Sequence, residues 1–263
     1  MIKGKTKGIR KITAYWNKRA KRYDEYYKNF KGAVEQYIDL YLLKRYLPKK
    51  KDARILDTAG GTGRITLSLL EMGYLVTLCD ISSGMLRVAR EKIQKRGLLN
   101  QVKIFGCDAC DMPFPDGTFD FVICYGVEMK ALKELSRVTK RNGIISMCIA
   151  NNLGNAISKF REEPKRALAL LESASDREFG KNEKYCVVTE RNLEKILKVQ
   201  RINIIAIYAG DIWNLLAIPE KILDSHAWKK RFFRQTVEMM LKLSENPFVR
   251  GVSRRWVLYG ERM

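Results

Sequence analysis

Histidine is almost absent from this sequence of 263 residues, which contains only His226. Structural zinc sites need four cysteine, histidine or acidic ligands, and Cys107 and Cys110 form a single Cys-x-x-Cys pair with no second pair to complete such a site. The six cysteines show no paired pattern, and three of them lie in apolar, strand-like runs where reduced cysteines pack as small hydrophobic residues. The sequence therefore predicts neither a metal centre nor a disulfide framework.

Long apolar runs are missing as well. No run approaches the roughly 18 residues that a membrane-spanning helix needs, and the N-terminus lacks the apolar stretch of a signal peptide. With 46% hydrophobic residues, the chain can bury one sizeable core. We expect a soluble, cytoplasmic protein built on one α/β domain with additions.

Acidic residues are few in relation to basic ones. There are 29 Asp and Glu against 50 Lys and Arg, which gives a formal net charge of +21. A positive surface potential of this size attracts polyanions, so RNA is the first expected partner and an acidic membrane surface the second. A generally lysine-rich surface is the alternative, although such surfaces usually gain glutamate together with lysine.

The N-terminal stretch concentrates this charge. Residues 1–22 contain nine Lys or Arg and no acid, and Tyr15, Trp16 and Tyr23 lie in or directly after them. Basic side chains beside aromatic faces can hold phosphates and stack bases. Alternatively, the stretch is a helical cover whose aromatic rings pack onto the domain. Tyr15, Trp16 and Tyr23 are also candidates for a lid over a ligand site.

Strands and helices alternate from residue 53 onward. The periodicity predicts strands at 54–57, 74–79, 102–105, 119–124 and 143–149, and helices at 63–72, 82–96 and 128–139. It further predicts helices at 157–173, 189–199 and 219–243 and strands at 202–208 and 255–259. Another predicted helix begins at Gly32 and precedes the first strand. Such alternation is typical of a parallel sheet covered on both faces, whose ligands bind outside the carboxyl ends of the strands.

The run Asp57-Thr58-Ala59-Gly60-Gly61-Thr62-Gly63 connects the first predicted strand to its helix. Glycines let the backbone approach a ligand closely, and the first turn of the helix offers unpaired N–H groups and the positive end of its dipole. This run is therefore a candidate nucleotide-cofactor loop.

Acidic residues stand at the carboxyl ends of three predicted strands: Asp57, Asp80 and Asp108. Because these ends lie side by side in a doubly wound sheet, one shared ligand is expected. The two oxygens of Asp80 can accept hydrogen bonds from both hydroxyls of a ribose, and Asp108 can meet the exocyclic amine of adenine. The alternative is that the aspartates cap helices or turns. The residues expected to wall the adenine ring are Ile81, Met85 and Ala109.

These motifs resemble the class I S-adenosylmethionine-dependent methyltransferases, and the resemblance extends over residues 50–150. Besides the glycine loop, it includes Leu78–Ser82, Gly106–Ala109, Met112–Asp120 and Leu135–Gly143, in the order of that family. It implies an α/β, doubly wound, Rossmann-like sheet of seven mostly parallel strands, with an antiparallel C-terminal hairpin and helical additions at the N-terminus and after the fifth strand. The expected organisation is an N-terminal arm or lid (1–48), a cofactor-binding half (49–150) and a substrate-facing half (151–263).

The resemblance implies S-adenosylmethionine as the cofactor, with the loop Ala59–Gly63 against its methionine part, Asp80 on its ribose, and Asp108 and Ala109 beside its adenine. The complete expected cofactor-binding set is Asp57, Ala59, Gly60, Gly61, Gly63, Asp80, Ile81, Met85, Asp108, Ala109 and Tyr125. Two features depart from the family. Ala59 replaces a usual glycine, which we expect to be tolerated only at a negative φ, and the loop after Tyr125 is short.

Within the family, Asp57–Gly61, Tyr208–Asn214 and the preceding Lys31-Gly32 resemble the branch that methylates a carboxylate on a wobble-position uridine modification in tRNA. That branch has an arginine where Asp211 aligns. Because an acid does not bind a carboxylate, the resemblance does not transfer that substrate to this chain.

Methyl transfer from a sulfonium needs orientation of the acceptor but no metal and no strong base, so no catalytic residue is predicted. Candidates for the acceptor pocket are Tyr125, Asn151 and Asn152, at the ends of the fourth and fifth strands. The favoured expectation is methylation of RNA, such as tRNA. The alternatives are a small-molecule acceptor, such as a quinone or a carboxylate, and a non-catalytic RNA-binding protein that keeps the fold.

Overall fold

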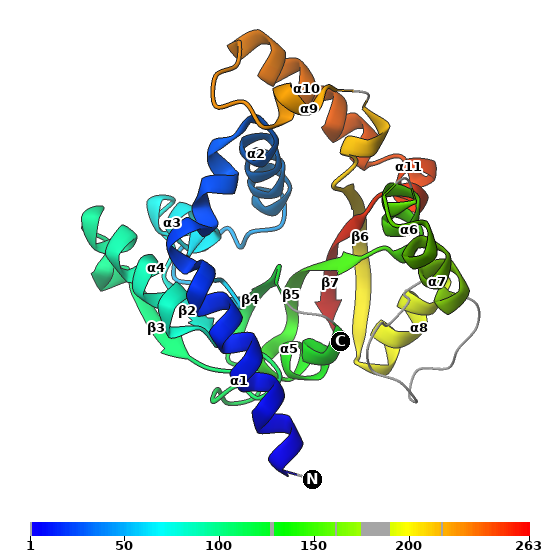
Figure 1. Ribbon diagram of the computed structural model, residues 1–263. Coiled ribbons are helices and arrows are strands. Elements are labelled where there is room, and N and C mark those ends of the chain that lie inside the picture. The colour runs from blue at the N-terminus through cyan, green and yellow to red at the C-terminus, as the bar shows by residue number, and fades with distance from the viewer. Residues whose placement is uncertain (1, 127–128, 161, 175–189, 217) are drawn as a thin grey trace.

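The computed structural model describes residues 2–126, 129–160, 162–174, 190–216 and 218–263. In this part of the chain seven strands form one sheet in the order β3-β2-β1-β4-β5-β7-β6 (Figure 1). Only β7 runs antiparallel to its neighbours β5 and β6, which confirms the predicted fold class. The strands are β1 Ile55–Thr58, β2 Val76–Asp80, β3 Val102–Gly106, β4 Phe119–Cys124, β5 Thr139–Ala150, β6 Ile202–Gly210 and β7 Arg255–Arg262.

The helices precede, connect and follow these strands. The α-helices are α1 Ile2–Arg19, α2 Phe30–Lys44, α3 Arg64–Glu71, α4 Ser83–Lys95, α5 Leu132–Val138, α6 Asn152–Lys159, α7 Pro164–Ala174, α8 Glu190–Val199, α9 Glu220–Leu223, α10 Lys230–Ser244 and α11 Pro247–Val252. Short 3₁₀ helices are η1 Ala20–Lys28, η2 Leu99–Gln101, η3 Met129–Ala131 and η4 Trp213–Leu215. None of the helices described combines the length and the apolar character that crossing a bilayer requires.

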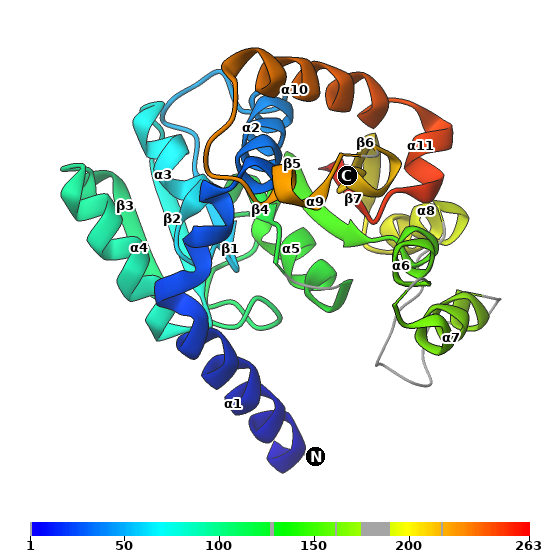
Figure 2. The ribbon, with the colours of Figure 1, turned by 45° about the horizontal axis from the view of Figure 1, so that its top comes forward.

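Helices cover both faces of the sheet, and Figure 2 shows α2, α3 and α10 on the side opposite α5. On the first face, side chains of these three helices pack against Ile55, Phe121 and Val257 of the strands. On the second face, α5 and α8 place Leu135 and Leu193 against the alternate strand residues. Strands β1, β2 and β4 are thus buried on both faces, which is why they read as largely apolar runs.

Two predicted helices are each interrupted. The predicted helix 157–173 is wrong because α6 ends at Lys159 and α7 begins at Pro164, whose missing N–H is no loss in a first turn. The predicted helix 219–243 is also wrong, since the Ser225 hydroxyl bonds to the backbone of Ala227 and closes a turn between α9 and α10. Residue 189, the first of the predicted helix 189–199, lies outside the described residues.

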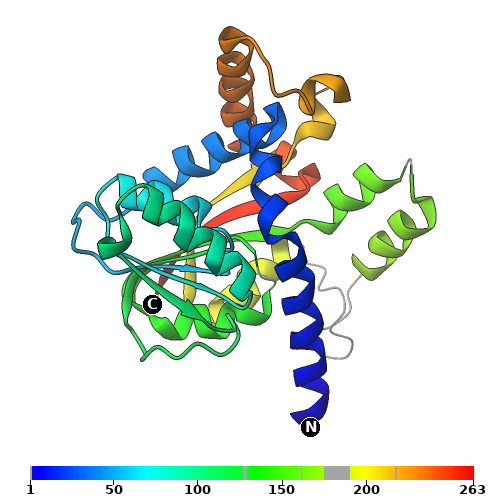
Figure 3. The same cartoon turned by 60° about the vertical axis from the view of Figure 1, so that its left-hand side comes forward.

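The N-terminal arm is helical and lies against α4. Figure 3 shows α1 passing the sheet with the N-terminus directed away from it. Asn17 Oδ1 accepts hydrogen bonds from Gly84 N and Ser82 Oγ, both at 2.8 Å. A Cβ at Gly84 would lie 3.1 Å from the Asn17 Cα, so the absence of a side chain there allows the two helices to touch.

Candidate functional site

Asp57 lies beneath the glycine loop, at the end of β1, and is 2% exposed. Its Oδ2 accepts hydrogen bonds from Thr66 Oγ1 at 2.6 Å and Thr66 N at 3.1 Å, and so ties the first turn of α3 to the strand. Burial raises the pKa of Asp57 to about 6, although the hydrogen bonds from Thr66 oppose that shift. Asp57 therefore supports the loop from below.

The raised pKa of Asp57 predicts a pH-dependent stability. The folded state disfavours the ionised carboxylate, so the stabilisation from this group is complete below its unfolded pKa and is lost as pH rises through about 6. From pH 4 to pH 7, we expect the unfolding free energy of the wild type to fall by about 2 kcal/mol relative to Asp57→Asn. Urea unfolding of both proteins at both pH values measures how far their unfolding free energies differ. A difference between the two proteins that is the same at pH 4 and pH 7 would contradict the prediction.

The loop requires glycine at these positions for different structural reasons. A Cβ on Gly60 would lie 2.4 Å from Leu78 Cδ1, so the backbone passes directly over β2. Gly61 and Gly63 have φ values of 58° and 71°, in the left-handed region that favours glycine. Nothing lies within 4 Å of a Cβ built on Gly61, so this part of the loop faces open space where a ligand can approach.

Ala59 adopts φ of 51°, so the expectation that an alanine here needs a negative φ is wrong. The neighbouring backbone imposes the left-handed conformation, which costs an alanine on the order of 1 kcal/mol. We expect Ala59→Gly to raise the unfolding free energy by about 0.5 kcal/mol, because part of the relieved strain is offset by the greater freedom of glycine in the unfolded chain. Ala131→Gly, at φ −76°, is the control and should be destabilising in the same denaturation series.

Asp80 ends β2 and is 8% exposed. Its Oδ1 accepts from Ser82 N at 2.8 Å and its Oδ2 from Gly61 N at 2.9 Å. Burial raises the pKa of this carboxyl, and the backbone N–H groups of Ser82, Gly61 and Ile81 counter the rise. The carboxylate is therefore held in position at the end of β2, and a carboxylate held in this way can accept hydrogen bonds from ribose hydroxyls.

The end of β3 is a turn. Asp108 Oδ1 accepts from Cys110 N at 2.9 Å, which is the turn-forming role that the sequence left as the alternative. Ala109 and Met85 are buried, and Ile81 is partly exposed beside Asp80. An adenine contact by Asp108 and the three wall residues remains a prediction.

The acceptor candidates after β4 and β5 make internal contacts. The Tyr125 hydroxyl lies 2.8 Å from Ser146 Oγ and 3.3 Å from the Tyr259 hydroxyl, so its tip points into the core. The Asn151 side chain caps α6 by accepting from Leu153 N at 3.1 Å and donates to Gly251 O at 2.9 Å. Their roles toward an acceptor remain predictions, and the side chain of Asn152 lies outside the described part of the structure.

The N-terminal arm contacts the glycine loop directly, which the sequence did not reveal. Asp24 in η1 accepts from Thr62 Oγ1 of the loop and is paired with Lys92 of α4, both at 2.6 Å. Thr62 and Lys92 lie 38 and 68 residues away from Asp24 along the chain, so no local sequence pattern predicts these contacts. The predicted lid residue Trp16 packs edge-on against Tyr15 and Tyr23 along the same arm.

A buried ion cluster adjoins the loop on its other side. Asp39 of α2, which is 1% exposed, accepts from Arg64 at 3.0 Å and from Arg255 at 2.9 Å. Arg64 follows Gly63 directly, and Arg255 begins β7. Sequence reasoning also missed this cluster, because its members come from three distant elements.

Comparisons with known proteins fit this geometry. Residues 55–143 match the family model described as a methyltransferase domain. This stretch begins with β1 and contains the loop, Asp80 and Asp108. Residues 55–143 therefore form a methyltransferase domain.

Curated relatives of this domain include the ubiquinone/menaquinone biosynthesis C-methyltransferase UbiE of Sinorhizobium fredii, 33% identical over 142 residues, which are 50% of this chain and 55% of the relative. The protein of the same name from Xanthomonas oryzae is 42% identical over 103 residues, 36% of this chain and 41% of the relative. The similarity therefore spans about half the length of these relatives.

Solved structures share the fold over most of the chain. Geranyl diphosphate methyltransferase in complex with S-adenosylmethionine superposes with a TM-score of 0.57 at 14% identity, covering 87% of this chain and 86% of the other. The [4+2]-cyclase SpnF superposes with a TM-score of 0.54 at 16% identity, covering 87% and 80%. Because a cyclase has the same fold, the fold alone does not define the reaction.

The methyltransferase domain fits S-adenosylmethionine in two respects. The loop faces open space at Gly61, and backbone N–H groups fix the Asp80 carboxylate beside it. When bound, S-adenosylmethionine supplies an electrophilic methyl group on a sulfonium. The loop backbone and Asp80 would hold it, and Asp24 would keep the N-terminal arm against the loop.

Proposed function

We propose that this protein is an S-adenosylmethionine-dependent methyltransferase whose acceptor is a small molecule. One observation carries the proposed activity: the glycine loop faces open space, and its Gly61 N donates a hydrogen bond to the fixed Asp80 carboxylate beside it. The protein contributes orientation and exclusion of water, which are the main requirements of methyl transfer to a good nucleophile.

The choice of a small molecule over RNA is supported by the curated relatives, which are named for methylation at carbon in quinone biosynthesis. This observation favours the alternative over the RNA acceptor that the net charge first indicated.

RNA remains the second candidate because of the net charge of +21 and the many basic residues of α1. A protein that binds RNA through phosphate contacts loses affinity steeply as salt rises. RNA binding that disappears at physiological salt would leave the small-molecule acceptor as the remaining candidate.

The experiment that tests the proposal uses cofactor labelled in the methyl group. The protein is incubated with a total RNA extract and, separately, with a small-molecule and lipid extract, and the label is followed in each. We expect label in the small-molecule pool. Label in RNA would instead support an RNA methyltransferase, and RNA binding with no transfer in either pool would support a non-catalytic RNA-binding protein.

A further inference from the structure

The helix α1 uses only one of its sides for packing within the chain. Its half-buried side chains are spaced by four and three residues, as one face of a helix requires: Ile9, Thr13 and Trp16. Beside them, Asn17 accepts a hydrogen bond from the backbone of Gly84 in α4 at 2.8 Å. This side of the arm therefore faces the domain and is not free to meet a partner.

The opposite side of α1 is exposed and basic. Lys11, Tyr15 and Lys18 repeat the spacing of four and three residues, but two positions further along, which is about 200° around the helix axis. All three side chains are exposed. The Arg19 guanidinium lies over the Tyr15 ring, 3.7 Å from its centre, and that residue is 48% exposed. This side thus combines positive charge with planar groups that a partner can reach.

The neighbouring helix α4 extends this basic surface. It lies against α1, as Figure 1 shows, and its exposed residues include Arg87 and Arg90. Glu91 is the only acid in the sequence of α4. We call the exposed bases Lys11, Lys18, Arg87 and Arg90 the arm surface.

Acids of the chain do not neutralise the arm surface. In the part of the chain that the structure describes, none of its four bases takes part in an ion pair. The two acids nearest to the arm in the sequence are already occupied, because Asp24 pairs with Lys92 and Glu25 pairs with Lys28, each at 2.6 Å. The positive potential of the arm surface is therefore directed outward.

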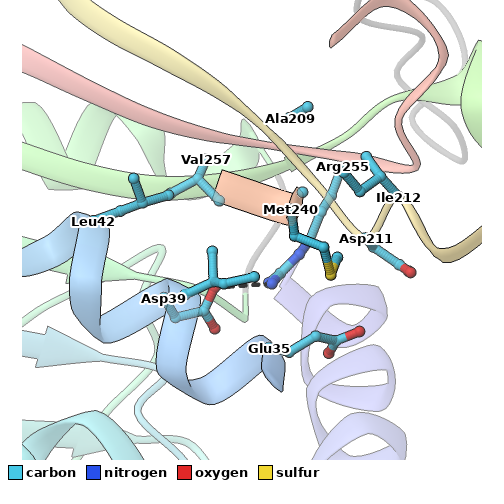
Figure 4. A pocket seen from close by; sticks show the side chains of 11 residues that line it. Glu35, Asp39, Leu42, Ala209, Asp211, Ile212, Met240, Arg255 and Val257 are labelled. Atoms are coloured by element: carbon cyan, nitrogen blue, oxygen red, sulfur yellow. Dashed lines mark hydrogen bonds and ion pairs between the residues drawn. The ribbon is translucent and has the colours of Figure 1, made fainter. Parts of the chain in front are cut away.

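Bases in the interior of the molecule behave differently. Figure 4 shows Arg255 directed at Asp39, which accepts its hydrogen bond at 2.9 Å, and Arg64 contacts the same carboxylate at 3.0 Å. A buried charge without a partner is costly, so these interior bases need their acid for stability. The bases of the arm surface are exposed to water, where an unpaired cation has no such cost and can attract an external anion.

A nucleic acid suits the arm surface better than a membrane does. Helices that lie in a membrane surface insert an apolar face into the lipid, whereas the half-buried side of α1 is directed to the domain. Phosphate groups require only accessible bases. In addition, the exposed Tyr15 ring and the Arg19 guanidinium are the kind of planar groups on which nucleic-acid bases stack.

We propose that the arm surface binds the phosphodiester backbone of a nucleic acid, while Tyr15 and Arg19 stack on a base. This inference goes beyond the proposed function, because it concerns binding and holds for any methyl acceptor. None of the bases of the arm surface belongs to the expected cofactor site at the glycine loop. Nucleic-acid binding and cofactor binding can therefore be measured separately.

The test uses the full chain and a triple variant with Lys11→Gln, Lys18→Gln and Arg87→Gln. The probes are a short fluorescent RNA duplex and a DNA duplex of the same sequence, and anisotropy is measured over a series of salt concentrations. Each lost phosphate contact lowers the salt dependence by about one unit of slope, so we expect a slope that is two to three units smaller than in wild type. At about 0.1 M salt, this corresponds to binding that is about 100-fold weaker.

The matched control carries Lys229→Gln, Lys230→Gln and Arg234→Gln. These exposed bases lie at the start of α10, which is far from α1 in Figures 1 and 2. The control removes the same number of lysines and arginines as the first variant, and so the same net charge. We expect it to bind both duplexes with an affinity and a salt slope close to those of wild type.

Several results would overturn the arm surface as a nucleic-acid site. These are wild type that binds neither duplex at low salt, an unchanged slope in the first variant, or equal weakening in both triple variants, which would mean that total charge alone attracts the probe. Binding of phosphatidylglycerol vesicles by a wild type that binds neither duplex would assign the surface to a membrane instead. Selective weakening in the first variant supports the proposal, and the duplex that binds more tightly identifies the nucleic acid.

S-adenosylmethionine binding is measured with the same three proteins to separate this inference from the proposed function. We expect equal cofactor affinity in all three. Absence of cofactor binding in wild type overturns the proposed function alone. A loss of duplex binding in the first variant, with cofactor affinity and circular dichroism unchanged, supports the arm surface and excludes misfolding as the cause.

Discussion

The variant Asp80→Ala is expected to bind S-adenosylmethionine about 100-fold more weakly than wild type. Each hydrogen bond to a charged group stabilises by about 1.5–3 kcal/mol, and two ribose hydroxyls lose their acceptor together. The variant also frees Gly61 N, so the loop that should face the methionine part of the cofactor loses its support. Isothermal titration calorimetry measures the dissociation constant.

The matched control for this prediction is Asp52→Ala. Asp52 is exposed and precedes β1, at the opposite edge of the sheet, so its removal should leave cofactor affinity unchanged. Circular dichroism establishes that Asp80→Ala keeps its secondary structure. An affinity for the cofactor within threefold of wild type in a folded Asp80→Ala variant would refute the assignment of this site.

The variant Asp39→Ala is expected to lower the unfolding free energy by about 3–5 kcal/mol, because it leaves two largely buried guanidinium groups without their carboxylate. Arg64 and Arg255 both direct a nitrogen at Asp39, at 3.0 and 2.9 Å, and neither can release its proton to avoid the cost. Urea denaturation followed by tryptophan fluorescence measures this change.

The control for Asp39→Ala is Glu238→Ala, which breaks an exposed pair with Lys242 on α10. Exposed pairs of this kind contribute little, and we expect a change below about 0.5 kcal/mol. A loss of less than about 1 kcal/mol in Asp39→Ala would mean that water reaches the cluster, in contradiction to its burial.

The two predictions concern one connected arrangement. Asp80 is held by the loop on one side, and Asp39 is held by Arg64 at the other end of the same loop. Asp24 adds a third contact, from the arm to Thr62. Stability and cofactor binding should therefore be coupled, since the bonds that fix the loop also fix the fold around it.

Local sequence patterns were sufficient to predict the strands β1–β5 and the helix α4. Apolar runs that end in an acid, and serine before a periodic segment, act over a few residues and depend little on the rest of the chain. Local patterns did not predict that helices end after Lys159 and Asp224. The helical spacing of apolar residues continues past both points, although a new helix begins at Pro164 and the Ser225 side chain closes a turn.

The sequence by itself determined the doubly wound sheet, the glycine loop and the position of Asp80, because turn chemistry and strand ends are local properties. Only the tertiary structure decided the positive φ of Ala59, the docking of Asp24 on Thr62, and the meeting of Asp39 with Arg64 and Arg255. These contacts join residues that are far apart in the chain, and their energy depends on burial and on exact distances that exist only once the sheet and its helices are packed.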